Sequence, residues 1–223
     1  MSTISNPETF TDLTADPPVR GFLHHPGKPS GDGLVLTHGA GSNCQSPLLT
    51  ALSGVFADAG FTVLRYDLPY RQARSFGPPG PGDAKRDRAG LKNAVAALKT
   101  IASGRLFVGG HSYGGRQASM LIADEPDLSA GLLLLSYPLH PPRKPEQLRT
   151  QHFFNLQTPA FFVHGTRDPF GSLQEIEQAL KLIPAKTKLL AVEGTGHDLG
   201  FKGKSKREGL PRTVSEQFQN FLP

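Results

Sequence analysis

The fold of this chain is decided by the stretch Leu106-Phe-Val-Gly-Gly-His-Ser-Tyr-Gly-Gly-Arg116. An apolar run ends there in Gly110-His-Ser-Tyr-Gly114, the G-x-S-x-G pattern in which a serine occupies a tight turn between a strand and a helix. Such a turn strains the serine backbone, and residues without Cβ two positions before and after it let the chain fold back closely. The pattern therefore predicts a strand over residues 106–109, an exposed hydroxyl on Ser112, and a helix that continues to Ala123.

Length and composition bound the class of protein. At 223 residues, of which 37% are hydrophobic, the chain suits one sizeable core, and we expect a single domain over residues 1–223. We expect residues 1–18 to form a polar segment and an edge hairpin, and residues 67–83 and 198–212 to form long loops. No apolar run approaches the roughly 18 residues of a membrane span, and the polar N-terminus shows no secretory signal. We therefore expect a cytoplasmic protein that does not enter membranes.

Charge and cysteine content exclude further classes. The formal net charge of +5 includes a basic cluster at Lys202, Lys204, Lys206 and Arg207, but no pattern of a DNA- or RNA-binding module accompanies it. We therefore expect no nucleic-acid partner and a solvated basic surface, with an anionic substrate or partner as the alternative. Cys44 is the only cysteine, which excludes an internal disulfide and offers no metal-ligand spacing. We expect it to be a small loop residue rather than a nucleophile.

Strand and helix patterns alternate along the chain after residue 33. Apolar or β-branched runs predict a hairpin at 9–13 and 19–24, then strands at 34–37, 61–66, 106–109, 130–136, 160–164 and 188–192. Apolar residues at helical spacing predict helices at 47–59, 86–103, 113–123 and 173–183, and a closing helix capped by Thr213. This alternation predicts the α/β class, with a doubly wound, mostly parallel sheet and helices on both faces.

Three residues with complementary chemistry follow three of these strands. Ser112 follows the strand at 106–109, Asp168 the strand at 160–164, and His197 the strand at 188–192. In an open parallel sheet the carboxyl ends of the strands form one edge, so these side chains are expected to meet there. A serine needs a base to remove its proton, an imidazole provides that base, and a carboxylate orients the imidazole. The order Ser, Asp, His therefore predicts a triad with Ser112 as nucleophile, His197 as base and Asp168 as acid.

Each of these residues also has an ordinary structural interpretation. Asp168 precedes a proline and could be a turn residue, and His197 could be a surface histidine in a glycine-rich loop. Glu193 and Asp198 are alternative acids, but both lie too close to His197 in sequence to reach the far side of its ring. His111 precedes the nucleophile, and its side chain is expected to point away from the site. The joint placement of Ser112, Asp168 and His197 favours the catalytic interpretation.

Hydrolysis through a tetrahedral intermediate also needs backbone N–H donors for the negative oxygen. One expected donor is the N–H of Tyr113, directly after the nucleophile, and the other is the N–H of Ala40 in the loop His38-Gly-Ala-Gly41. Loss of one such donor typically costs about 3–4 kcal/mol of transition-state stabilisation. A plain glycine turn is the alternative for this loop. Phosphate-binding interpretations fail, because position 44 lacks the third glycine of a dinucleotide fingerprint and Arg116-Gln117 replaces the Lys-Ser/Thr of a P-loop.

Four motifs together resemble the α/β-hydrolase superfamily. They are Thr37-His-Gly-Ala-Gly-Ser-Asn43, Gly110-His-Ser-Tyr-Gly-Gly-Arg116, His164-Gly-Thr-Arg-Asp-Pro169 and Gly196-His-Asp198. The chain is similar in particular to the small, cap-less, dienelactone-hydrolase-like branch, which includes a eukaryotic testis-expressed protein and a subunit of a chromatin-acetylating complex. Ser112 stands where dienelactone hydrolases proper have a cysteine, which argues against dienelactone as the substrate.

The resemblance also implies how open the site is. Lids in this superfamily usually follow the strand that here ends at Ser136, and residues 137–159 are too few for a cap domain. The resemblance therefore implies an open site, walled in part by the loop at 67–83. Tyr70 and Arg71 in that loop are candidates for substrate contact, and a solvated loop is the alternative.

These observations lead to one leading functional hypothesis. We expect a serine hydrolase that cleaves small carboxylic esters, or thioesters or amides, through an acyl-enzyme, with no metal and no cofactor. The expected partner is a small-molecule ester, and the expected assembly is a monomer or a homodimer. The alternatives are a scaffold protein on a hydrolase fold, or a perhydrolase or acyltransferase that uses the same triad.

Overall fold

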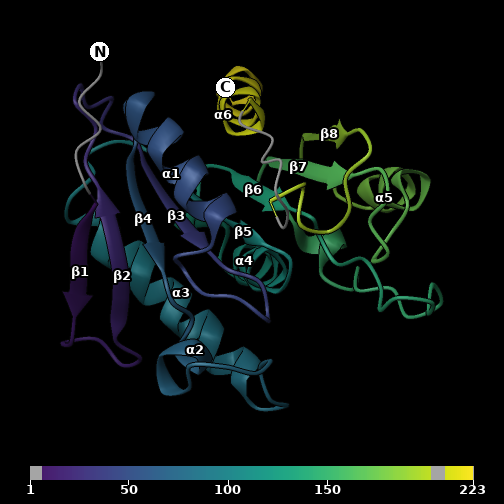
Figure 1. Ribbon diagram of the computed structural model, residues 1–223, viewed down its shortest axis with the longest axis horizontal. Coiled ribbons are helices and arrows are strands. Elements are labelled where there is room, and N and C mark those ends of the chain that lie inside the picture. Colours follow the sequence, from purple (N-terminus) through teal and green to yellow (C-terminus); the bar gives the residue numbers. More distant parts are fainter. Residues whose placement is uncertain (1–6, 202–208, 223) are drawn as a thin grey trace.

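One sheet positions every other part of the molecule. Within residues 7–201 and 209–222, which the computed structural model describes, eight strands form this sheet in the order β1-β2-β4-β3-β5-β6-β7-β8 (Figure 1). The strands are β1 Glu8–Asp12, β2 Val19–His24, β3 Gly33–Thr37, β4 Thr62–Tyr66, β5 Leu106–His111, β6 Leu132–Leu135, β7 Ala160–Gly165 and β8 Thr187–Val192. The hairpin β1–β2 forms one edge and β2 is antiparallel to β4, whereas all neighbours from β4 to β8 are parallel. This confirms the predicted doubly wound, mostly parallel sheet.

The middle strands are apolar because both faces of the sheet are covered. All four leucines of β6 are fully buried, as are all five residues of β3. A parallel strand between two helix layers has no solvent-facing side, so its sequence becomes a continuous apolar run instead of an alternating one. The Leu-rich run from 132 to 135 therefore lies at the centre of the molecule.

Helices pack on both faces of the sheet (Figure 1). One face carries α1 Pro47–Asp58 and α6 Leu210–Phe221, joined by an edge-to-face contact of Phe56 with Phe218 at 5.7 Å. The other face carries α3 Asp83–Lys99, α4 Tyr113–Asp124 and α5 Leu173–Leu180. In the described part of the chain, no helix combines the length and the apolar character that crossing a bilayer requires.

Two predicted helix starts are confirmed at the level of individual hydrogen bonds. The Ser46 side chain accepts from the Leu49 N–H at the start of α1, and Pro47 occupies the first helical position. Ser172 and Glu175 form the predicted capping box at the start of α5. Both caps satisfy backbone N–H groups that have no acceptor inside the helix.

Other boundaries differ from the sequence-based expectation. The segment 67–83 is not a continuous loop, because it contains the short helix α2 Pro69–Ala73, and α3 begins at Asp83 and ends at Lys99 rather than spanning 86–103. The closing helix α6 begins at Leu210, so Thr213 lies in its first turn, where its N–H and hydroxyl both donate to Gly209 O. The basic cluster at 202–207 and part of the predicted loop 198–212 lie outside the described residues.

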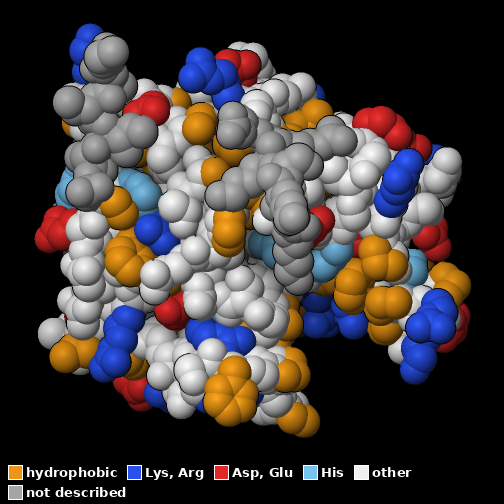
Figure 2. Space-filling view, in the orientation of Figure 1, with side chains coloured by type: hydrophobic (Ala, Val, Ile, Leu, Met, Phe, Trp, Pro, Cys, Tyr) orange, Lys and Arg blue, Asp and Glu red, His pale blue; other side chains and the backbone are white. Residues whose placement is uncertain are grey.

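No cap domain covers the carboxyl edge of the sheet in the described residues. Between β6 and β7 the chain forms only turns and the short 3₁₀ helix η2 Phe153–Asn155. On the face shown in Figure 2, basic side chains lie in separate groups, several of them beside acidic ones, rather than in one continuous patch.

Candidate active site

The turn after β5 holds Ser112 in the strained conformation that its sequence pattern predicts. Ser112 has φ 51° and ψ −116°, and its N–H donates to Leu135 O at 2.8 Å. A Cβ on Gly110 would lie 2.8 Å from Thr37 O, and one on Gly114 would lie 2.5 Å from His38 O. The two glycines are therefore needed because the turn packs directly against the end of β3. This contact fixes the serine relative to the loop that follows β3.

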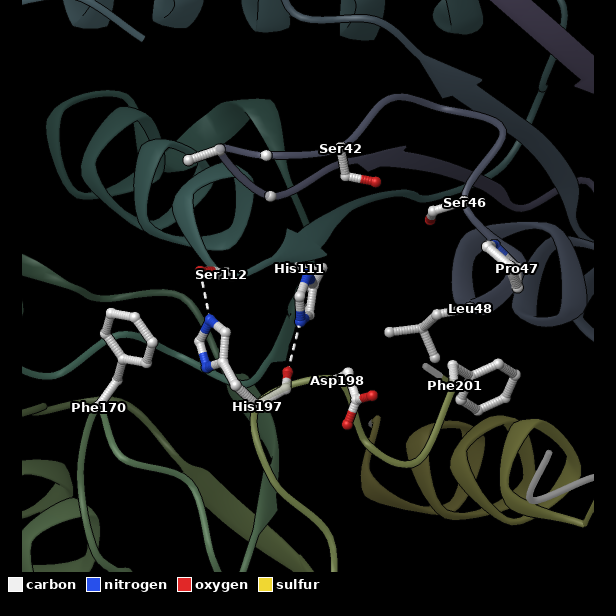
Figure 3. A pocket seen from close by; sticks show the side chains of 13 residues that line it. Ser42, Ser46, Pro47, Leu48, His111, Ser112, Phe170, His197, Asp198 and Phe201 are labelled. Carbon is white, nitrogen blue, oxygen red and sulfur yellow. Dashed lines mark hydrogen bonds between the residues drawn. The ribbon is translucent and has the colours of Figure 1, made fainter. Parts of the chain in front are cut away.

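The structure brings together the three residues predicted as a triad. His197 Nε2 lies 2.7 Å from Ser112 Oγ (dashed in Figure 3), and His197 Nδ1 lies 2.8 Å and 3.0 Å from the two carboxylate oxygens of Asp168. A carboxylate only accepts, so Nδ1 carries the proton and Nε2 presents its lone pair to the serine hydroxyl. The three side chains therefore form one directed chain of hydrogen bonds from β5, β7 and β8.

Asp168 is held by its own loop. The side chain is buried, and the Phe170 N–H donates to Oδ1 at 2.9 Å. His164 Nε2 lies 3.8 Å from the same carboxylate, but it donates to Gly171 O at 2.8 Å, and burial lowers the pKa of His164. Asp168 therefore has one close imidazole partner, His197, and one backbone donor that sets its orientation.

A pocket opens in front of Ser112 and His197 (Figure 3). Its volume is about 280 Å³. The polar end holds the Ser112 hydroxyl and the His197 imidazole together with the backbone of Ala40 and Gly41. The remaining wall is apolar at Leu48, Phe170 and Phe201 and polar at Ser42, Ser46 and Asp198. The Phe170 ring lies 4.2 Å from the His197 ring, centroid to centroid, and shields one face of the imidazole. The pocket therefore presents the Ser112 hydroxyl at one end of a small, largely apolar space.

His111 lies on the pocket side, which corrects the expectation that it points away. Its Nε2 donates to the His197 carbonyl at 2.7 Å, and the ring lines the pocket (Figure 3). Side chains alternate along a strand, so His111 shares a face of β5 with Phe107, which packs among the α1 and α6 residues. The His197 loop crosses above that face, and His111 therefore anchors its backbone.

Both predicted oxyanion donors lie next to the triad. Ala40 lines the pocket, and no hydrogen-bond acceptor for its N–H occurs among the described residues. Tyr113 is the first residue of α4, where backbone N–H groups have no intrahelical acceptor. Its side chain points away from the pocket, because its hydroxyl donates to the buried Asp87 at 2.7 Å. Burial raises the pKa of Asp87, and the hydrogen bonds from Tyr113 and the Tyr70 N–H oppose that rise.

Tyr70 and Arg71 do not line the pocket, which corrects the expectation that they contact the substrate. Their side chains are buried behind the loop 39–42 and donate to its carbonyl oxygens. Helix α2 places them there, and the sequence-based interpretation of residues 67–83 as a loop missed this helix.

Cys44 and His38 are structural residues. Cys44 is buried, and burial raises its pKa to about 12, so it is not a thiolate nucleophile. The His38 ring accepts the Leu68 N–H at Nε2, so its Nδ1 carries the proton and donates to Gly39 O at 2.9 Å. Burial lowers the pKa of His38 and keeps this ring neutral.

Sequence reasoning missed Phe170, Phe201 and Asp87. Only Asp87 left a usable signal, since it precedes Leu91 by four residues and so puts a carboxylate on the apolar face of α3. Within residues 7–201 and 209–222, no group of three or more His, Cys, Asp or Glu side chains is arranged to hold a metal ion.

Comparison with known proteins identifies relatives over nearly the whole chain. The family described as alpha/beta hydrolase domain matches residues 31–221. A dienelactone hydrolase from Anabaena variabilis superimposes with a TM-score of 0.76 at 19% identity, over 98% of this chain and 100% of the other. A serine hydrolase without lid from Xanthomonas campestris gives 0.72 at 15% identity, over 100% and 97%. An esterase from Pyrococcus furiosus gives 0.74 at 17% identity, over 97% and 90%. At these identities the structural likeness shows a common fold.

Proposed function

Because this chain belongs to the alpha/beta hydrolase domain family, we propose that it is a serine hydrolase that cleaves small carboxylic esters through an acyl-enzyme. The observation that carries the proposal is the directed chain Asp168–His197–Ser112, which ends in a hydroxyl facing a small apolar pocket. The family membership confirms the resemblance drawn from the four motifs. The narrower resemblance to the eukaryotic members stays a prediction.

The first half of the proposed reaction transfers the acyl group to the enzyme. Ser112 Oγ attacks the ester carbonyl carbon while its proton passes to His197 Nε2, which lies 2.7 Å away. The carbonyl electron pair moves to oxygen, and the N–H groups of Ala40 and Tyr113 stabilise the resulting oxyanion. The intermediate then collapses, and the proton on Nε2 passes to the departing alkoxide. Asp168 stabilises the imidazolium during this step but remains ionised.

The second half releases the acid. A water molecule gives a proton to His197 Nε2 and attacks the acyl carbon, and the same two N–H groups stabilise the second oxyanion. Collapse breaks the bond to Ser112 Oγ, which recovers its proton from Nε2. The open side of the pocket supplies the water, since no cap covers this edge of the sheet in the described residues.

The pocket argues for a small substrate. Its volume of about 280 Å³ lies just below the range of ligand pockets, which is roughly 300–1,000 Å³. The walls beyond the triad are apolar at Leu48 and Phe201, where a short alkyl or aryl group would be removed from water. We therefore place short-chain neutral esters first, ahead of thioesters and amides.

The test is a chain-length series of 4-nitrophenyl esters from acetate to decanoate, run beside Ser112→Ala. We expect kcat/KM to be highest for the short acyl chains and to fall for the long ones. In triad enzymes, loss of the nucleophile lowers kcat by about 10⁶, so Ser112→Ala should be inactive at the level of detection. Turnover that persists in Ser112→Ala would contradict the proposal.

The same assay with other substrates and acceptors distinguishes ester hydrolysis from thioester hydrolysis, amide hydrolysis and acyl transfer. An acyl thioester and an anilide test the other acyl groups, and added hydrogen peroxide or an alcohol tests transfer to acceptors other than water. A scaffold role predicts a different result, namely no turnover of any ester and no acyl-enzyme mass in the wild-type protein.

A further inference from the structure

We propose that Tyr70, Arg71 and Asp87, here called the bracket, set the position of both halves of the oxyanion hole without touching substrate. They are positioning residues, since they act through the backbone of the loop 39–42 and through Tyr113. The inference rests on the proposed function, because it assigns a role in stabilising the tetrahedral intermediate.

The bracket holds the loop by its carbonyl oxygens. The Tyr70 hydroxyl lies 2.9 Å from Ala40 O and 3.2 Å from Gly39 O. Arg71 donates from Nη2 to Ala40 O at 3.3 Å and from Nε to Ser42 O at 2.8 Å. The Ala40 and Ser42 carbonyls therefore point toward the bracket. Gly39 O is shared, because it also accepts from His38 Nδ1 at 2.9 Å and from the Ser42 N–H at 3.0 Å.

The hydrogen bonds to the loop carbonyls also orient the N–H groups of the same peptide units. In a planar trans peptide, the C=O of one residue and the N–H of the next point in opposite directions. Holding the Ala40 carbonyl toward the bracket therefore turns the Gly41 N–H toward the other side of the loop. The Gly39 carbonyl, held by Tyr70 together with the His38 ring, turns the Ala40 N–H in the same way. Both residues line the pocket on that side. The arrangement thus supports the Ala40 N–H as a donor and adds the Gly41 N–H beside it.

Asp87 links this loop to the second half of the oxyanion hole. The fully buried carboxylate accepts the Tyr113 hydroxyl at 2.7 Å and the Tyr70 N–H at 3.0 Å. The rings of Tyr70 and Tyr113 also pack edge to face at 5.8 Å. The N–H groups of Ala40 and Tyr113 come from distant segments of the chain, and one carboxylate of α3 fixes the distance between those segments.

The charge of Arg71 strengthens the same arrangement. Its guanidinium is buried and donates only to backbone carbonyls, and it has no carboxylate partner among the residues that the structure describes. The positive charge therefore lies at the carbonyl end of peptide units whose N–H ends face the developing oxyanion. Hydrogen-bonded groups aligned in this way polarise one another, which increases the donor strength of those N–H groups.

The experiment compares Tyr70→Phe with Tyr66→Phe. Tyr66 is a matched control, since its hydroxyl is fully buried but has no hydrogen-bond partner among the described residues. Three quantities are measured for each variant: kcat and KM on the best short ester, the inhibition constant of a trifluoromethyl ketone, and the thermal midpoint. The ketone adds to the serine and places a negative oxygen in the oxyanion hole, so its affinity reports that site directly.

We expect Tyr70→Phe to lower kcat about tenfold with KM unchanged within about twofold, because a displaced donor costs less than a removed one. The affinity for the ketone should fall by the same factor, and Tyr66→Phe should match the wild type in both. Tyr113→Phe, which breaks the link to Asp87, should repeat the pattern and serves as the second test if Tyr70→Phe does not fold.

Equal kcat and ketone affinity in Tyr70→Phe, Tyr113→Phe and the wild type would overturn the inference, as would a fall in kcat without a fall in ketone affinity. These outcomes differ from failure of the proposed function. In that case the wild-type protein itself neither turns over esters nor binds the ketone.

Discussion

Replacing Asp168 with asparagine isolates the role of the buried carboxylate. The Phe170 N–H donates to Oδ1 of Asp168 at 2.9 Å, so the amide oxygen of asparagine takes that position. The amide NH₂ then faces His197 Nδ1, which lies 2.8 Å from the other carboxylate oxygen. An NH₂ group only donates, and it replaces the nearer of the two oxygens, since Oδ1 lies 3.0 Å from Nδ1. We therefore expect Nδ1 to become the acceptor and the imidazole proton to move to Nε2.

The expected loss of kcat follows from the position of the imidazole proton in Asp168→Asn. Nε2 lies 2.7 Å from Ser112 Oγ, and once it carries a hydrogen it has no lone pair to accept the serine proton. A triad with its imidazole in this tautomer loses about 10⁴ in kcat, which corresponds to about 5.5 kcal/mol of transition-state stabilisation. The fold should change little, because asparagine has the same shape as aspartate and keeps the bond from Phe170.

The assay is steady-state hydrolysis of 4-nitrophenyl acetate, with the thermal midpoint measured on the same samples. Glu193→Gln is the control, since Glu193 is an exposed carboxylate close to His197 in sequence that interacts with Thr166 instead. We expect Glu193→Gln to stay within about twofold of the wild-type kcat, as a surface change away from the site. A folded Asp168→Asn protein that keeps more than a tenth of the wild-type kcat would refute the assigned tautomer and the role of Asp168.

Three further predictions concern stability. Burial, reinforced by Arg65 and His25, lowers the pKa of His24 from 6.5 to about 4, and its Nε2 accepts from Arg65 Nε at 2.8 Å. As the pH falls, His24 takes up its proton at a higher pH in the unfolded chain than in the folded chain. The contribution of neutral His24 to the free energy of unfolding is therefore fully present above about pH 6.5 and is lost as the pH drops toward 4, by about 1–2 kcal/mol between pH 7 and pH 5. Urea unfolding at both pH values should show this loss, and a His24→Gln protein with the same loss would contradict it. Gly114→Ala should lower the free energy of unfolding by roughly 1–3 kcal/mol, since its Cβ would lie 2.5 Å from a backbone oxygen. Gly54→Ala, where the Cβ meets nothing within 4 Å inside α1, should raise it by about 0.5–1 kcal/mol, and a loss there would contradict the helix assignment.

The residues of the candidate triad could be predicted because their signals are local or follow from the chain order. The glycines around Ser112 report a close backbone approach, and they are needed wherever the turn packs against β3. Asp168 and His197 each follow a strand of the parallel part of the sheet, so the topology brings them to one edge without any detail of packing. Side-chain identity and strand order together therefore sufficed for the candidate triad.

Side-chain direction in the connecting segments could not be predicted in the same way. Tyr70 and Arg71 occur in a stretch rich in proline, glycine and arginine, which is typical of an exposed loop. Asp87, which lies in α3 seventeen residues after Tyr70, accepts the Tyr70 N–H and so holds this stretch against the core. The direction of the His111 side chain has a related cause, since the loop that covers its face of β5 follows β8. Contacts between distant segments decide these directions, and no local pattern encodes them.

The most direct test of the catalytic assignment is the intact mass of the protein after reaction with a fluorophosphonate probe. A fluorophosphonate forms a covalent bond only with a serine whose proton is removed by a neighbouring base, so the reaction reports the chain Asp168–His197–Ser112 rather than a hydroxyl alone. We predict one adduct per chain, located on Ser112 by peptide mapping, slow labelling in Asp168→Asn, and none in Ser112→Ala. An unlabelled wild-type protein, or an adduct that persists in Ser112→Ala, would contradict the assignment.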